Sequence, residues 1–221
     1  MQQFKRLSVL IFVSFFGFAL GANAQEKPFQ REVDALTKRI ADSGWEQRGY
    51  VFTGSSSIRF WMSLQKDFPE ENIINTGFGG SKASDLMAHL PEVVLNYVPS
   101  KVFIYEGDND LWADVKVADI MTKLDEIVTW IKMENQDTEV YLIGAKPSPA
   151  RWEKRSSYKI LNQFMREYCI AHPGVQYINV WDDMLGENGK PIPEIFIADS
   201  LHMNQKGYKI WKEIFTPYVK E

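Results

Sequence analysis

The sequence contains little of what several classes of protein depend on. It has one cysteine, Cys169, and three histidines that lie far apart, so it offers neither an internal disulfide nor a cluster of metal ligands. Acidic residues outnumber basic ones, 29 to 25, and no basic stripe is present to neutralise phosphates. We therefore expect no metal, no cofactor and no nucleic-acid partner.

Long apolar runs are also scarce, and the longest lies near the N-terminus. Leu7–Leu20 is apolar apart from Ser and Gly, follows Lys5 and Arg6, and precedes the small residues Ala22-Asn23-Ala24. At about 14 residues it is short for a membrane span, so the pattern predicts a signal peptide over residues 1–24, with an uncleaved anchor as the alternative. We expect export to the periplasm or the extracellular space of a bacterium, with no stable membrane insertion after cleavage.

Residues 25–221 contain no repeat, low-complexity tract or Pro/Gly-rich linker, and we expect them to form a single domain. They hold 23 basic and 29 acidic residues, a formal net charge of −6. Hydrophobic residues make up 45% of the chain, which is enough for a packed core without disulfides. Cys169 lies in an apolar helical stretch and is expected to be a small buried hydrophobic residue. These features leave the oligomeric state open.

From about residue 48, short β-rich runs alternate with longer amphipathic segments. The predicted strands are Tyr50–Thr53, Ile73–Asn75, Val102–Tyr105, Val140–Ile143 and Gln176–Val180. The predicted helices are Ser84–Tyr97, Val115–Glu134, Tyr158–Ala171 and Gln205–Tyr218, with an earlier amphipathic helix containing Val33, Leu36 and Ile40. The alternation predicts an α/β fold in three layers, αβα, around a doubly wound, mostly parallel sheet of five strands. Right-handed crossovers would bring the carboxyl ends of the strands to one edge, where ligands of open α/β sheets bind.

Four polar segments carry the side chains that suggest chemistry. They are Gly54-Ser55-Ser56-Ser57, Gly77-Phe78-Gly79-Gly80-Ser81, Gly107-Asp108-Asn109-Asp110 and Asp199-Ser200-Leu201-His202. The first three follow predicted strands, and together the four offer a serine, hydrogen-bond donors and a histidine beside a carboxylate. Those are the parts that acyl transfer to serine requires. Each segment also has a plain structural explanation, because serines cap helices, glycine runs make turns and asparagine favours Asx-turns.

The spacing of Asp199 and His202 selects one histidine from three. A carboxylate three residues before a histidine can accept from the ring Nδ1–H, which leaves Nε2 to take a proton from serine. His89 lies within a predicted helix and is expected to be a surface or hydrogen-bonded helical residue. His172 precedes Pro173-Gly174 at a helix end, where a capping role is expected.

In this order the four segments resemble the blocks of the SGNH (GDSL-type) hydrolase family, a resemblance that covers nearly all of residues 25–221. The first block departs from the family pattern by having Ser55 at its Asp position. The resemblance implies a flavodoxin-like hydrolase fold, with Ser56 and not Ser57 as the nucleophile, assisted by His202 and Asp199.

The same resemblance implies an oxyanion hole formed by the backbone N–H groups of Ser56 and Gly80 and by the Asn109 side chain. Gly80 is chosen over Gly79 because the family glycine is the last before the polar residue. Three stretches are most similar to a bacterial branch that resembles platelet-activating-factor acetylhydrolase. They are Ser55-Ser56-Ser57-Ile58-Arg59, residues 77–81 and Lys146-Pro147-Ser148-Pro149-Ala150-Arg151.

Three further residues are candidates for contact with a substrate. Ser57 neighbours the predicted nucleophile, and Arg151 follows the fourth predicted strand, where it would either bind a polar or anionic group or pair at the surface. Trp112 would either line the pocket or belong to the core.

The predicted function is a serine esterase for short acyl groups, above all acetyl, on a carbohydrate or another small alcohol, because the sequence has no long apolar insertion that would form a lid. Rival hypotheses are a thioesterase, a peptidoglycan O-acetyl esterase or a lysophospholipase-type lipase on the same scaffold, and a carbohydrate-binding protein without catalysis.

Overall fold

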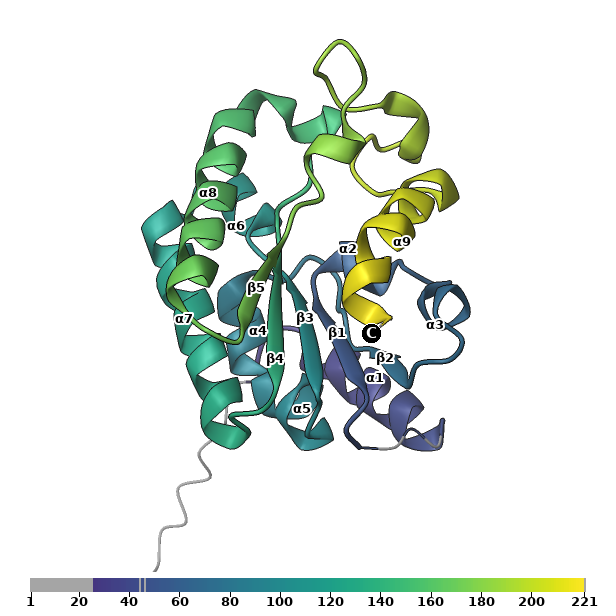
Figure 1. The fold of residues 1–221 in the computed structure, drawn as a ribbon, viewed down its shortest axis with the longest axis vertical. Coiled ribbons are helices and arrows are strands. Elements are labelled where there is room, and N and C mark those ends of the chain that lie inside the picture. The colour runs from purple at the N-terminus through teal and green to yellow at the C-terminus, as the bar shows by residue number, and fades with distance from the viewer. Residues whose placement is uncertain (1–25, 44, 46, 221) are drawn as a thin grey trace, which may run out of the picture.

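The computed structural model describes residues 26–43, 45 and 47–220, so the predicted signal peptide lies outside the described residues. The sheet contains five strands, all parallel, in the order β2-β1-β3-β4-β5 (Figure 1). The strands are β1 (Tyr50–Gly54), β2 (Ile73–Asn75), β3 (Lys101–Tyr105), β4 (Glu139–Ile143) and β5 (Val175–Ile178). The strand order reverses between β1 and β3, and such a switch point is where ligands bind in doubly wound sheets.

Helices cover both faces of the sheet. They are α1 (Gln30–Asp42), α2 (Ser56–Arg59), α3 (Leu64–Asp67), α4 (Ala83–Ala88), α5 (Leu90–Val93), α6 (Asp108–Trp112), α7 (Val117–Glu134), α8 (Arg155–Ala171) and α9 (Gln205–Val219). Short 3-10 turns occupy Leu95–Tyr97, Pro149–Lys154, Asp182–Met184 and Pro193–Ile195. The three-layer, doubly wound α/β fold predicted from the alternation of strands and helices is confirmed.

The central strands alternate their side chains between two separate cores. Val51, Val102 and Val140 contribute to the core beneath α1, α4, α5, α7 and α8. Phe52 and Phe103 face the opposite core beneath α2, α3 and α9, where their rings stack at 4.1 Å. Both faces of β3 are buried, as the continuous apolar run Val102–Tyr105 indicates.

The predicted helix over Ser84–Tyr97 is wrong as a continuous element. The chain forms α4, then α5 and a 3-10 turn, with His89 between the two helices at φ −110° and ψ 10°. Pro91 explains the break, because it has no N–H to donate to the preceding turn. The His89 side chain is fully buried, and its Nε2 lies 2.6 Å from the Pro28 carbonyl oxygen, so it is a hydrogen-bonded core residue.

The last long connection differs from the short links that the sequence suggests elsewhere. Between β5 and α9 the chain makes two 3-10 turns and two isolated antiparallel bridges. This segment lies at the top of Figure 1. Its apolar residues Met184, Ile195 and Phe196 are buried against the core beneath α9. In residues 26–220, apart from positions 44 and 46, no helix has the length and apolar character that crossing a bilayer requires.

Candidate active site

The first polar segment leaves β1 at a position that admits only glycine. Gly54 has φ +119°, and a Cβ atom there would lie 2.1 Å from the Tyr105 carbonyl oxygen. Parallel pairing places Gly54 directly opposite Tyr105, so the backbones of β1 and β3 approach closely at the switch point. The chain then turns into α2, which begins at Ser56.

Backbone and side-chain hydrogen bonds join the first three polar segments. The Ser55 N–H donates to the Tyr105 carbonyl at 3.1 Å, and the Phe78 N–H donates to the Gly54 carbonyl at 2.9 Å. Asn109 Nδ2 donates to the Ser81 carbonyl at 2.9 Å. The carboxyl ends of β1, β2 and β3 therefore form one continuous surface.

The fourth segment reaches the same surface from the far end of the chain. His202 Nδ1 lies 2.6 Å from Asp199 Oδ2, and His202 Nε2 lies 3.0 Å from Ser56 Oγ. Ser56 and His202 are 146 residues apart in the sequence. The structure thus brings Ser56, His202 and Asp199 into one hydrogen-bonded row.

Local backbone geometry orients the Asp199 carboxylate. Oδ1 accepts from the N–H groups of Leu201 and His202, each at 2.9 Å, while Ser200 adopts a left-handed φ of 58°. Burial alone would raise the pKa of Asp199, but the hydrogen bonds from His202 and from the two backbone groups together outweigh burial and lower the pKa to about 2. The carboxylate is therefore charged at neutral pH and is held facing the imidazole.

Two neighbouring contacts hold the histidine in place. The Phe60 ring meets the His202 ring edge-on, with centroids 4.9 Å apart. The Ala150 N–H donates to the Ser200 carbonyl at 3.1 Å, which ties the loop after β4 to the turn between Asp199 and His202.

The three groups predicted to form the oxyanion hole each have an unused N–H. In the described part of the chain, the backbone N–H groups of Ser56 and Gly80 have no hydrogen-bond acceptor. Gly80 adopts φ +75°, and nothing lies within 4 Å of where its Cβ would stand, so its surroundings are open. Asn109 uses one amide hydrogen on Ser81 and keeps the second for another acceptor.

Ser57 differs from Ser56 in both exposure and contacts. The residue is 3% exposed, and its carbonyl accepts from the Tyr208 hydroxyl at 2.9 Å. Ser56 is half-buried and faces His202. Contact of Ser57 with a substrate stays a prediction.

Arg151 forms a buried ion pair and not the surface pair that the sequence allowed. Its side chain is 10% exposed; Nη1 lies 2.5 Å from Asp108 Oδ1, and Nη2 lies 3.0 Å from Asn109 Oδ1. Trp112 is 45% exposed, and the Arg151 guanidinium lies 5.3 Å from its ring centroid. Contact of either residue with a substrate stays a prediction.

Asp108 is the centre of a buried polar cluster that the sequence did not predict. Its carboxylate accepts from the hydroxyls of Tyr158 at 2.6 Å and Tyr105 at 2.8 Å, and lies 3.2 Å from Lys146 Nζ. Burial alone would raise the pKa of Asp108, but the charges of Lys146 and Arg151 outweigh it and hold the pKa below its ordinary value. These contacts fix Asp108, which is the residue directly before Asn109.

Two more buried carboxyl groups support the glycine loop after β2. Asp110 accepts from the backbone N–H groups of Ala83 at 3.2 Å and Gly107 at 3.2 Å, and Glu106 Oε1 accepts from the Ser81 hydroxyl at 2.7 Å. Burial raises the pKa of Asp110 to about 6 and raises that of Glu106 well above its ordinary value. The available sequence signal was three acidic residues within the five positions that follow the apolar run Val102–Tyr105.

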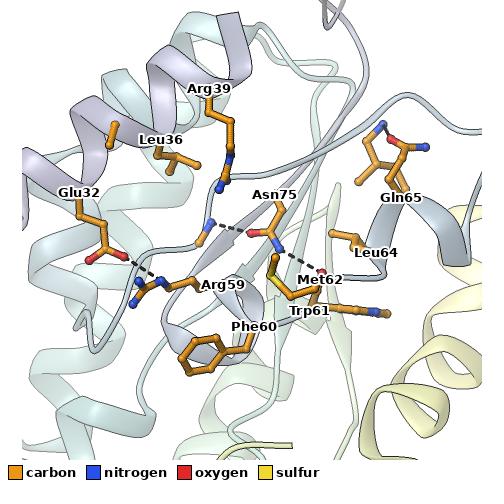
Figure 2. A pocket seen from close by; sticks show the side chains of 13 residues that line it. Glu32, Leu36, Arg39, Arg59, Phe60, Trp61, Met62, Leu64, Gln65 and Asn75 are labelled. Carbon is orange, nitrogen blue, oxygen red and sulfur yellow. Dashed lines mark hydrogen bonds and ion pairs between the residues drawn. The ribbon is translucent and has the colours of Figure 1, made fainter. Parts of the chain in front are cut away.

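A depression of about 620 Å³ lies between α1, α2 and β2 (Figure 2). Glu32 and Arg59 face each other across it, with Oε1 and Nε 3.0 Å apart, and Glu32 also accepts from the Gly79 N–H at 3.0 Å. Phe60, whose ring contacts His202, lines the same depression. The depression therefore adjoins the row formed by Ser56, His202 and Asp199.

Comparison with known proteins agrees with this architecture. Residues 39–210 match the model of the GDSL-like Lipase/Acylhydrolase family. An N-acylneuraminate cytidylyltransferase from Escherichia coli O18:K1:H7 is 24% identical over 214 residues, which cover 92% of this chain and 49% of the relative. The chain thus spans about half the length of that curated relative.

Solved structures share the fold at low sequence identity. A Streptococcus pneumoniae protein named for platelet activating factor superposes with a TM-score of 0.76 at 21% identity, over 87% of this chain and 93% of that one. A GDSL-like lipase from Bacteroides thetaiotaomicron gives 0.70 at 22% identity, over 87% and 96%. An acetylxylan esterase from Geobacillus stearothermophilus gives 0.65 at 15% identity, over 80% and 96%.

Proposed function

We propose that this chain, which belongs to the GDSL-like lipase/acylhydrolase family, is a carboxylic ester hydrolase that works as a serine esterase through an acyl-enzyme. The observation that carries the proposal is the row of two hydrogen bonds, at 2.6 Å and 3.0 Å, that links Asp199 to His202 and His202 to Ser56. A nucleophile, its base and a group that orients the base are the three roles that activation of serine requires.

In the first step, Ser56 Oγ attacks the ester carbonyl while His202 Nε2 takes its proton, and Asp199 stabilises the imidazolium that forms. The carbonyl oxygen becomes an oxyanion, which the N–H groups of Ser56 and Gly80 and the Asn109 amide would stabilise. His202 then protonates the departing alcohol. In the second step, water attacks the acyl-serine with His202 again acting as base, which releases the acid and restores Ser56.

The proposed substrate is a short-chain ester, acetyl above all, on a carbohydrate or another small alcohol. In the long connection between β5 and α9, Met184, Ile195 and Phe196 are buried in the core and Ile197 is exposed, so this segment has too little exposed apolar surface to support a lid for long acyl chains. The named acetylxylan esterase that shares the fold acts on an acetylated glycan, which agrees with this choice of substrate class.

We also propose that residues 1–24 direct export and are removed after Ala24, with function in the periplasm or outside the cell. The basis is the sequence pattern alone. Intact-mass measurement of the exported protein tests it: a mature chain starting at Gln25 is expected, and a chain that retains Met1 contradicts it.

The nucleophile is tested by a matched pair of variants at adjacent serines. Ser56→Ala is expected to abolish hydrolysis of 4-nitrophenyl acetate, because no other hydroxyl faces His202 Nε2 in the described structure. Ser57→Ala is expected to retain most of the activity, since the hydrogen bond to Tyr208 uses the Ser57 backbone carbonyl and survives the change. A fluorophosphonate probe followed by peptide mapping should label Ser56 only.

Loss of activity in Ser57→Ala together with an active Ser56→Ala would overturn the assignment. A protein that neither hydrolyses esters nor reacts with the probe would instead favour a binding function. A panel of esters that varies acyl length first and alcohol second, with Ser56→Ala as the blank, tests the substrate class. A preference for long acyl chains or for thioesters would reject the acetylesterase proposal.

A further inference from the structure

Arg151 is held in one position by a buried acidic partner. Nη1 donates to Asp108 Oδ1 at 2.5 Å and to the Asp108 carbonyl at 3.0 Å, and the guanidinium lies 5.3 Å from the Trp112 ring centroid. Asp108 is itself fixed by Tyr105, Tyr158 and Lys146. A planar guanidinium fixed in this way is pre-organised to make a further directed hydrogen bond.

The second arm of the same guanidinium reaches the Asn109 side chain. Nη2 donates to Asn109 Oδ1 at 3.0 Å, while Asn109 Nδ2 donates to the Ser81 carbonyl at 2.9 Å. Arginine carries only donors and a carbonyl only accepts, so both neighbours demand the same orientation of the amide. In the flipped orientation, the NH₂ group would meet the guanidinium and the amide oxygen would meet the Ser81 carbonyl.

We propose that Arg151 is a positioning residue for the oxyanion hole, which holds the Asn109 amide with its free N–H toward the reacting carbonyl oxygen. The inference rests on the proposed function, because the second amide N–H of Asn109 has a catalytic role only if an oxyanion forms at the substrate carbonyl. An amide turned the other way would present an oxygen to the developing negative charge, which would oppose the reaction. Arg151 thus acts through Asn109 and needs no contact with the substrate.

The decisive variant is Arg151→Lys, which keeps a positive charge for Asp108 but replaces the two-armed guanidinium by one ammonium group. We expect kcat for 4-nitrophenyl acetate to fall by roughly 10-fold with KM changed less than about 2-fold, a smaller loss than the roughly 10²–10³-fold expected on removing the donor itself by Asn109→Ala. In the Asn109→Ala protein, adding Arg151→Lys should lower kcat by less than about 2-fold, because the residue it positions is gone.

Lys154→Met is the matched control. Lys154 Nζ lies 5.3 Å from the centroid of the same Trp112 ring and donates to the carbonyls of Leu111 and Trp112, but not to Asn109. Its loss removes a neighbouring cation without touching the amide, and kcat should stay within about 2-fold of the starting protein. A drop equal to that of Arg151→Lys would mean that any cation beside Trp112 has the same effect, which contradicts the proposal.

NMR spectroscopy of side-chain N–H groups separates this inference from the proposed function. In the Ser56→Ala protein, the side-chain NH₂ signals of Asn109 should move in Arg151→Lys and stay in place in Lys154→Met. Reciprocally, Asn109→Ala, which removes no buried charge, should shift the Arg151 Nη signals, so the test survives even if Arg151 variants fold poorly.

The outcomes are distinct. Unchanged Asn109 and Arg151 signals, or a kcat loss of equal size with and without Asn109, overturn the positioning role while leaving the esterase proposal intact. A rise in KM with kcat unchanged would also overturn it and assign Arg151 to substrate binding. Absence of any Ser56-dependent hydrolysis would reject the proposed function, and the signals would then report only on whether Arg151 orients Asn109.

Discussion

Two aspartates at the same edge of the sheet are both held charged, but by different physical means. Asp199 has a side chain that is 43% exposed, and hydrogen bonds from His202 and from two backbone N–H groups lower its pKa. Asp108 has a side chain that is 5% exposed, and two buried cations overcome the large cost of its burial. The comparison teaches that a carboxylate on the protein surface can serve chemistry at little cost to the fold, whereas a buried one becomes part of the fold.

The largest expected effect separates activity from stability at the exposed aspartate. Asp199→Asn should lower kcat/KM by roughly 10³–10⁴-fold, because the amide no longer fixes the imidazole tautomer or stabilises its charged form. The free energy of unfolding in urea should change by less than about 1 kcal/mol, since the side chain is 43% exposed and an amide oxygen can still accept from the Leu201 and His202 N–H groups. Asp183 is an exposed aspartate in the connection between β5 and α9, and Asp183→Asn is the control that should change neither quantity. A marked loss of stability in Asp199→Asn would break the distinction.

The buried aspartate should show the opposite behaviour. Asp108→Asn leaves Lys146 and Arg151 without a charged partner, and we expect the free energy of unfolding to fall by about 3–5 kcal/mol in urea denaturation. Asp114→Asn provides the matched control, because Asp114 pairs with Lys154 while 88% exposed. Its removal should cost less than about 1 kcal/mol. Equal losses at the two positions would show that burial is not what makes Asp108 important for stability.

Asp110, another buried carboxyl group, extends the comparison to the pH dependence of stability. Burial raises the pKa of Asp110 to about 6, although backbone hydrogen bonds from Ala83 and Gly107 oppose the rise. The folded protein therefore holds this proton more tightly than the unfolded chain. The contribution of protonated Asp110 to the free energy of unfolding is fully present below about pH 4 and is lost as the pH rises through 6.

Unfolding in urea from pH 4 to 6.5 should show this loss in the starting protein and much less of it in Asp110→Asn. The difference in the free energy of unfolding between the two proteins should change by about 2 to 3 kcal/mol across that pH range. Parallel pH profiles would mean that Asp110 does not carry the effect.

Much of the fold could be predicted because its signals are local. The five strands are short apolar runs followed by glycine or polar residues, and each predicted strand overlaps an observed one. The helix over Ser84–Tyr97 was wrong because its amphipathic pattern outweighed Pro91, which ends the hydrogen-bonding pattern after α4. The position of residues 179–204 above the sheet also carried no local signal, since the chain there is held by two isolated bridges and by burial of single side chains.

The residues of the candidate site also differ in how far the local sequence indicates them. Asp199 and His202 are three residues apart, and a turn of that length brings the carboxylate to the ring nitrogen whatever the rest of the fold does. Family resemblance pointed to Ser56, Gly80 and Asn109, which the structure places along one edge of the sheet. Glu106, Asp108 and Asp110 were not recognised as buried, because an acidic residue after a strand is equally consistent with an exposed loop.

The alternation of strands and helices, the glycine at the end of β1 and the Asp199–His202 pair follow from the order of residues, because each depends on neighbours within a few positions. Tertiary structure alone decided that Ser56 faces His202 across 146 residues, and that Arg151 lies against Asp108 and Asn109 some forty positions away. Such contacts depend on how the whole sheet packs, and burial then determines whether a charged side chain meets solvent, a substrate or another part of the protein.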